Sequence, residues 1–243
     1  MREAFTYMFK DKRLCSKALT YTILSFCAYF LINYSQLLFV PSYSNQITIT
    51  QSVKIFPYLI LFAGLAFKAL TGGYYLNTIS AINKQSSNYV LPFFNIKTCF
   101  LKGIKLLGSI ILIMVTIGAL LILSGPIKYY TFILVLFMTS ILSLSFLWLI
   151  AVKEKYFIIL HINEAIKLIK NNAKPYFKYL LTFWGAFLIS YGLSIASATL
   201  ISRWNAPYIE LTTISLIYGI IDAYFIFVYS FAIAKSIKED SVV

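Results

Sequence analysis

Two charged residues lie inside long apolar runs of this sequence and are its strongest candidates for chemistry. Lys68 follows Phe56 by 12 residues and Asp222 follows Tyr208 by 14, which at about 1.5 Å per helical residue gives depths of about 18 and 21 Å. A single charge in lipid is costly and needs a partner. Matching depth and opposite sign predict an ion pair between two helices. Such a pair would act as a coupling site or gate in a transporter, or it would fix helix packing.

The remaining ionisable residues form no catalytic pattern. The only histidine is His161, and Glu154 and Glu164 lie among lysines, where solvated ion pairs are the simplest interpretation. No hydrolase elbow, zinc-binding helix or nucleotide-binding loop is present. The three cysteines form no CxxC pair. We therefore expect a protein that is not an enzyme and has no cofactor and no metal site.

The elements that must position Lys68 and Asp222 are membrane-spanning helices. Of the 243 residues, 60% are hydrophobic and only 12% are charged, which is too few charges for the surface of a soluble domain. The mean hydropathy is +0.81. About 20 apolar residues suffice to cross a bilayer. The pattern predicts an all-α polytopic protein with one domain, residues 1–243, and about six transmembrane helices: 18–40, 56–79, 104–123, 127–152, 176–201 and 208–234.

The distribution of lysine and arginine predicts an orientation. The two terminal tails and the loops after the second and fourth spans hold 17 of the 21 basic residues, and the other loops hold three. Cytoplasmic loops are rich in such residues, so both termini are expected in the cytoplasm and the chain in the plasma membrane. The formal net charge of +13 then indicates contact with anionic lipid headgroups. It does not indicate nucleic acid.

Three basic segments have the pattern of amphipathic helices. They are residues 3–17, 93–105 and 158–174, and each places lysine on one face and apolar side chains on another. Helices of this kind lie at the membrane surface with their lysine stems extended toward water. We expect all three to be interfacial helices on the cytoplasmic side.

A glycine-rich motif follows Lys68. Gly72 and Gly73 allow either a close helix approach or a break near the end of the second span. Pro92 constrains the chain before the next helix. Helix packing is the simpler interpretation, and a ligand-binding loop is the alternative. The motif consists of Gly72, Gly73, Tyr74, Leu91, Pro92 and Gly103.

These residues, together with the N-terminal run Glu-Ala-Phe-Thr-Tyr-Met-Phe-Lys-Asp at 3–11, resemble the DUF4013 family of prokaryotic membrane proteins of unknown function. The similar positions are Gly73-Tyr74, Leu91-Pro92-Phe93 and Gly103-Ile104-Lys105. The family usually has acidic residues after Leu-Pro, whereas this chain has Phe93-Phe94-Asn95. The resemblance implies a polytopic membrane protein of a prokaryote and no particular activity.

Two functions agree with these observations. The first is a non-catalytic transport-related or permease-like bundle, which the intramembrane charges favour. The second is a scaffold or accessory protein that organises lipid or partner proteins, which the small loops and basic segments favour. A continuous polar cavity would favour the first, and a closed core with an apolar groove would favour the second.

Overall fold

The computed structural model describes residues 14–39, 55–84, 92–201 and 207–237, and over these residues the chain is helical and contains no strand. Six described helices are long and apolar enough to cross a membrane, which confirms the all-α polytopic architecture. The helices are α2 (Leu14–Phe39), α4 (Phe56–Lys84), α5 (Ile96–Leu123), α6 (Lys128–Lys153), α7 (Ile162–Asn171), α8 (Ala173–Ile201) and α9 (Pro207–Ser236).

Several helices extend beyond the apolar runs that predicted them. The second amphipathic segment is a correction to the sequence interpretation: from residue 96 it forms the first turns of α5, where the Asn95 side chain accepts a hydrogen bond from the Thr98 amide, and it is not a separate interfacial helix. A capped start lets one helix run from the polar end into the apolar run. Most of the first amphipathic segment, residues 3–13, lies outside the described residues.

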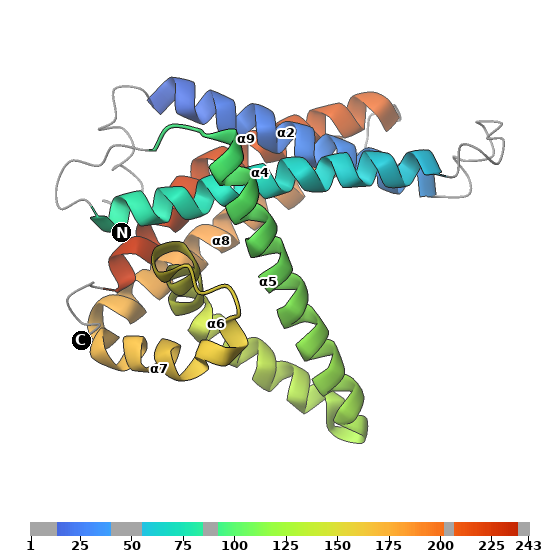
Figure 1. Cartoon of the computed structure of the whole chain (residues 1–243). Coiled ribbons are helices and arrows are strands. Elements are labelled where there is room, and N and C mark those ends of the chain that lie inside the picture. The colour runs from blue at the N-terminus through green and yellow to red at the C-terminus, as the bar shows by residue number, and fades with distance from the viewer. Residues whose placement is uncertain (1–13, 40–54, 85–91, 202–206, 238–243) are drawn as a thin grey trace.

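The third amphipathic segment contains a separate short helix, α7. Ala165 and Leu168 are buried, and α7 packs against α6 and α8. About half of its apolar stripe therefore contacts protein, while Ile162 and Ile166 stay exposed. Figure 1 shows α7 running in much the same direction as α4 and not across it. This direction differs from that of a helix lying flat on the membrane surface.

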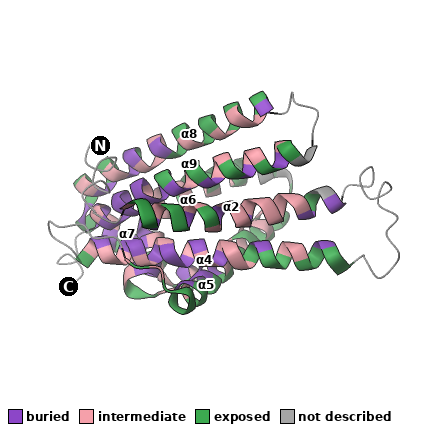
Figure 2. Ribbon diagram, turned by 90° about the horizontal axis from the view of Figure 1, so that it is seen from above, coloured by how far each residue is buried: buried purple, intermediate pink, exposed green. Residues whose placement is uncertain are grey.

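The long helices form two groups. In Figures 1 and 2, α2, α4, α8 and α9 lie side by side, whereas the α5–α6 hairpin diverges from them. The hairpin turns at Gly125, whose φ of +51° suits glycine, through a short 3-10 helix, Gly125–Ile127.

The described lysines lie mainly at one end of the molecule. We call this the basic end: α2, α5 and α8 begin there, α4, α6 and α9 finish there, and every described lysine except Lys68 and Lys128 belongs to it. The opposite end is called the far end and is on the right in Figure 1. The helices therefore keep the segregation of lysines that the sequence predicts.

The hydrophobic core lies toward the basic end. Its largest fully buried side chains include Trp148, Tyr176, Phe227 and Phe231, and all four belong to the basic-end halves of their helices. Figure 2 shows buried residues concentrated in these halves, while exposed residues predominate along much of the far halves. Most of the large buried side chains thus lie at the basic end, and the far halves expose more of their surface, although α2 and α4 meet closely there at Gly64 and Ile32.

One very close helix crossing joins the hairpin to the rest. A Cβ atom on Gly73 would lie 1.7 Å from the carbonyl oxygen of Cys99, and one on Gly103 would lie 1.7 Å from that of Ala69. Each glycine therefore lets the backbone of the other helix approach to contact. Helix α4 continues through Gly72 and Gly73 to Lys84, so the structure shows the close approach and not the break.

Candidate functional site

The structure brings Lys68 and Asp222 together. Lys68 Nζ on α4 lies 3.5 Å from Asp222 Oδ2 on α9, and their side chains are 36% and 22% exposed. Both residues lie near the middle of their helices, as the matched depths predict. The pair therefore joins the second and sixth spans at mid-depth.

Helix α2 supplies two further members of this site. Ser25 Oγ donates a 2.8 Å hydrogen bond to Asp222 Oδ2. Lys68 Nζ donates a 3.2 Å hydrogen bond to the Tyr29 hydroxyl and lies 4.4 Å from the centroid of the Tyr29 ring, a cation–π geometry. Tyr218 packs edge-on against the same ring. We call these five residues the charge cluster.

The two α2 residues were not predicted from the sequence. Ser25 and Tyr29 are uncharged and lie within an apolar run, so neither has to be paired on electrostatic grounds. The sequence does contain a signal for these two residues. The polar positions Lys17, Tyr21, Ser25 and Tyr29 recur at intervals of four, which places them on one helix face. A polar stripe of this kind indicates a helix that faces protein and not lipid.

The charge cluster lies where the packing changes along α4 and α9. On α9 a run of mostly buried residues begins at Ala223, directly after Asp222, and continues to Ile237. On α4, Tyr58, Leu59 and Phe62 are exposed, whereas Ala69 is 1% exposed. The cluster thus marks the boundary between the closed basic half and the open far half.

The charge cluster combines charged and hydroxyl groups. Its groups are an ammonium, a carboxylate and three hydroxyls, and both Lys68 and Ser25 contact the same oxygen of Asp222. No group of three or more histidine, cysteine or acidic side chains that could hold a metal occurs among the described residues. Opening the pair would leave one cation and one anion without a partner inside the span, which is costly.

The residues of the glycine motif have two roles in the structure. Gly73 and Gly103 form the helix crossing, and the Cβ position of Gly72 faces Leu106 of α5 at 3.2 Å. The Tyr74 hydroxyl donates a 3.2 Å hydrogen bond to the carbonyl oxygen of Pro92, which fixes the segment that leads into α5. Leu91 lies outside the described residues.

The other sequence candidates form ion pairs at the basic end. Lys155 Nζ lies 2.5 Å from Glu164 Oε2, and His161 Nδ1 lies 3.0 Å from Glu164 Oε1. The hydrogen bond from Lys155, assisted by His161, lowers the pKa of the Glu164 carboxyl. Lys102 pairs with Glu154 at 3.1 Å. These bridges connect α5 and α7 to the segment that directly follows α6.

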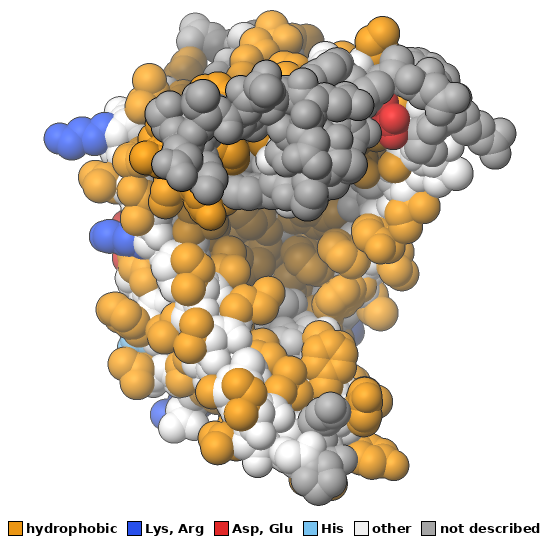
Figure 3. Space-filling model, turned by 90° about the vertical axis from the view of Figure 1, so that its right-hand side faces the viewer, with side chains coloured by type: hydrophobic (Ala, Val, Ile, Leu, Met, Phe, Trp, Pro, Cys, Tyr) orange, Lys and Arg blue, Asp and Glu red, His pale blue; other side chains and the backbone are white. Residues whose placement is uncertain are grey.

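The far end contains a second candidate site, an apolar recess. Figure 3 looks at the molecule from the far end and shows a hollow between the main group of helices and the α5–α6 hairpin, lined mostly by hydrophobic side chains. On α6, Ile133, Leu134 and Phe137 are exposed, and on α5, Ile111 and Met114 are exposed. We call this hollow the far-end recess.

Comparison with known proteins identifies no relative of this chain. No family model matches the chain, and no curated protein or solved structure matches it. The resemblance to the DUF4013 family therefore stays a prediction.

Proposed function

We propose that the protein is a non-catalytic accessory protein of the prokaryotic plasma membrane that organises lipid, with acyl chains held in the far-end recess. The observation that carries this proposal is the recess itself, which is apolar and lies beside a closed core. At mid-depth the Lys68–Asp222 ion pair is bonded to Ser25 and Tyr29, whereas the recess is lined mostly by hydrophobic side chains. The recess therefore suits an apolar occupant better than a hydrophilic solute.

The composition of α6 favours lipid over a partner helix as this occupant. Helices associate in membranes through small residues that allow close backbone approach. The far half of α6, residues 129–138, is Tyr-Tyr-Thr-Phe-Ile-Leu-Val-Leu-Phe-Met. Large branched and aromatic side chains form an uneven surface that suits flexible acyl chains better than a rigid helix.

The basic end supports the same proposal. Twelve described lysines lie there, and lysine near anionic headgroups is favourable by about 1 kcal/mol per residue. With this end in the cytoplasm, both termini are cytoplasmic and the far-end recess lies in the outer leaflet. The lysines fix the position of the bundle in the bilayer while the recess holds lipid.

A crosslinking experiment tests the proposal. The protein is reconstituted in nanodiscs with a phospholipid that carries a diazirine near the end of one acyl chain, transferred to detergent to remove loosely bound lipid, and then illuminated. We expect adducts to persist on residues 129–138 of α6 and to be lost from residues 187–195 of α8, which are also largely exposed. Equal loss from both segments would contradict a held lipid.

A second function is favoured by a separate observation. The charge cluster lies at the boundary between a closed half and an open half, where a transporter would hold its coupling site or gate. Spin labels at Tyr58 of α4 and Ile122 of α5, both exposed, report the opening of the hairpin. Transport predicts two distances whose populations change with Asp222→Asn, whereas an accessory protein predicts one distance in both variants.

A further inference from the structure

A cavity of about 310 Å³ lies at the basic end, away from both sites described above. It lies between the first turns of α2, the second half of α4 and the segment that leads into α5. This volume is at the lower limit of small-molecule sites, which are about 300–1,000 Å³. The lining residues are Ser16, Lys17, Thr20, Tyr21, Tyr74, Phe93 and Phe94.

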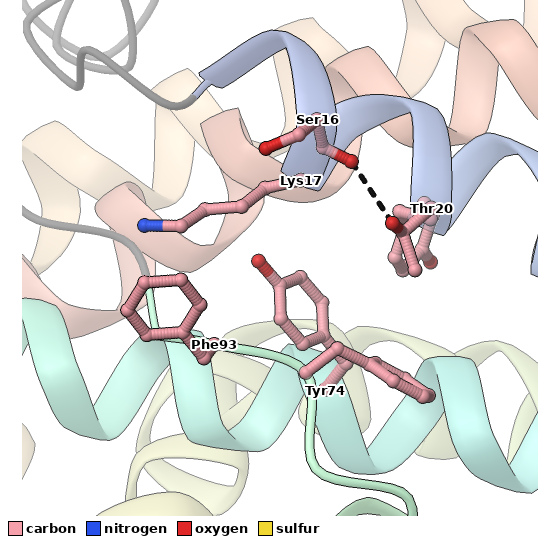
Figure 4. A pocket seen from close by; sticks show the side chains of 7 residues that line it. Ser16, Lys17, Thr20, Tyr74 and Phe93 are labelled. Atoms are coloured by element: carbon pink, nitrogen blue, oxygen red, sulfur yellow. Dashed lines mark hydrogen bonds between the residues drawn. The ribbon is translucent and has the colours of Figure 1, made fainter.

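The cavity combines one cation with hydroxyls and aromatic walls. Lys17 is only 6% exposed, and its Nζ lies 4.8 Å from the centroid of the Phe93 ring. Figure 4 shows the Lys17 ammonium close to the Phe93 ring, with the Tyr74 hydroxyl directed into the space between them. Among the described residues that line the cavity, Lys17 is the charged one. The described lining therefore combines a buried ammonium with hydroxyl groups.

The position of Lys17 in the sequence indicates the depth at which the cavity lies in the bilayer. Lys17 directly precedes the apolar run that begins at Ala18, so its ammonium lies at the boundary between hydrocarbon and headgroups. Lipid phosphates lie at this level, and lysine is a common partner for them. Phe93 and Phe94 add apolar surface of the kind that covers a glycerol backbone.

We propose that this cavity binds the phosphate group of an anionic phospholipid. Lys17 supplies the charge. The Tyr74 hydroxyl, whose bond to the Pro92 carbonyl is 3.2 Å long, can be redirected to a phosphate oxygen. The Thr20 hydroxyl donates to the carbonyl of Ser16 at 2.9 Å and keeps its lone pairs, so it borders the site without donating to the ligand. The site is independent of the far-end recess and of the function proposed for it.

The test uses native mass spectrometry of the full chain released from nanodiscs that contain phosphatidylcholine and a minor fraction of phosphatidylglycerol. Lys17→Gln removes the ammonium group of Lys17. Thr20→Phe occupies its rim from an exposed position and keeps the charge, so it carries the test if the first variant folds poorly. Lys170→Gln removes the same charge from exposed α7 and is the matched control.

We expect both cavity variants to lower the apparent affinity for phosphatidylglycerol about tenfold and the control to leave it unchanged. An equal fall in all three variants, or no fall in any, would show that only the general field of lysines attracts the lipid, and would overturn the proposal. A second arm adds inorganic phosphate to nanodiscs of phosphatidylcholine alone. If phosphate raises the melting temperature of the unmodified protein and Thr20→Phe abolishes the rise, the site takes free phosphate and the lipid assignment is wrong.

Discussion

The pairing of Lys68 with Asp222 leads to a sharp prediction about stability. Removing one partner of a buried ion pair costs about 3–5 kcal/mol, because the other charge stays buried without compensation. Here the side chains are 36% and 22% exposed, which reduces the penalty, so we expect Lys68→Met and Asp222→Asn each to cost about 2 kcal/mol. The two losses have different causes, since one leaves an anion and the other a cation.

The double variant should be more stable than the sum of the single losses predicts. It leaves no buried charge, and the asparagine oxygen still accepts the hydrogen bond from Ser25. We expect a total loss of about 1 kcal/mol, which corresponds to a coupling energy of about 3 kcal/mol between the two positions. Ser25→Ala alone removes one hydrogen bond and should cost about 1 kcal/mol.

The assay is reversible unfolding of the purified protein in mixed micelles with increasing mole fraction of dodecyl sulfate, followed by circular dichroism. Lys170→Met, on the exposed face of α7, is the control for loss of a lysine and should change the free energy of unfolding by less than about 0.5 kcal/mol. If the single losses simply add, to about 4 kcal/mol in the double variant, the two side chains do not interact and the reasoning from the structure fails.

Three further predictions concern the rest of the molecule. Gly73→Ala should lower the free energy of unfolding by about 2–4 kcal/mol, because its Cβ would lie 1.7 Å from a backbone oxygen of α5. The control is Gly108→Ala, whose Cβ would have nothing within 4 Å. It should stay within about 1 kcal/mol of the unmodified protein in the same unfolding assay. Folding lowers the pKa of Glu164. Its ionised carboxylate therefore stabilises the folded state fully above the pKa of the unfolded chain, and this effect is lost as the pH falls through the lower pKa of the folded state. Glu164→Gln should therefore flatten the profile of melting temperature against pH below about pH 5. In whole cells an impermeant maleimide should label Tyr130→Cys at the far end and leave Lys170→Cys at the basic end unlabelled; the reverse pattern would contradict the predicted orientation.

The sequence predicts the helices well because their physical causes are local. Apolar length alone identifies six spans, and the observed bounds differ from the predicted ones mainly at the basic end. There the spans continue into amphipathic turns, as Ile96–Leu123 does where the apolar run predicted a start at Ile104. Apolar content cannot locate such an end, because a helix continues as long as its backbone hydrogen bonds are satisfied.

The arrangement of the helices is harder to predict because it depends on contacts between distant residues. The ion pair was predictable, since charge and depth restrict the possible partners of Lys68 to few residues. Ser25 and Tyr29 were not, because an uncharged side chain in an apolar run has no obligatory partner. The divergence of the hairpin was not predictable either: Gly73 and Gly103 indicate that two backbones approach, and they do not specify the angle at which the helices cross.

The position of the charge cluster explains how a closed half and an open half coexist in one bundle. Toward the basic end, α4 is supported by α5 at the glycine crossing and by α6, where Trp148 Nε1 donates a hydrogen bond to Asn83. Toward the far end the hairpin leaves α4, and α2 and α9 remain beside it. Lys68 and Asp222 join α4 to α9 at this boundary, and the Ser25 hydrogen bond to Asp222 adds α2.

The ion pair thus replaces the packing that the hairpin no longer provides, so its loss should loosen the far halves of α4 and α9 first. Hydrogen exchange should therefore speed up in residues 56–67 of the Lys68→Met variant and stay unchanged around Trp148, whereas uniform acceleration would show that the pair supports the whole bundle.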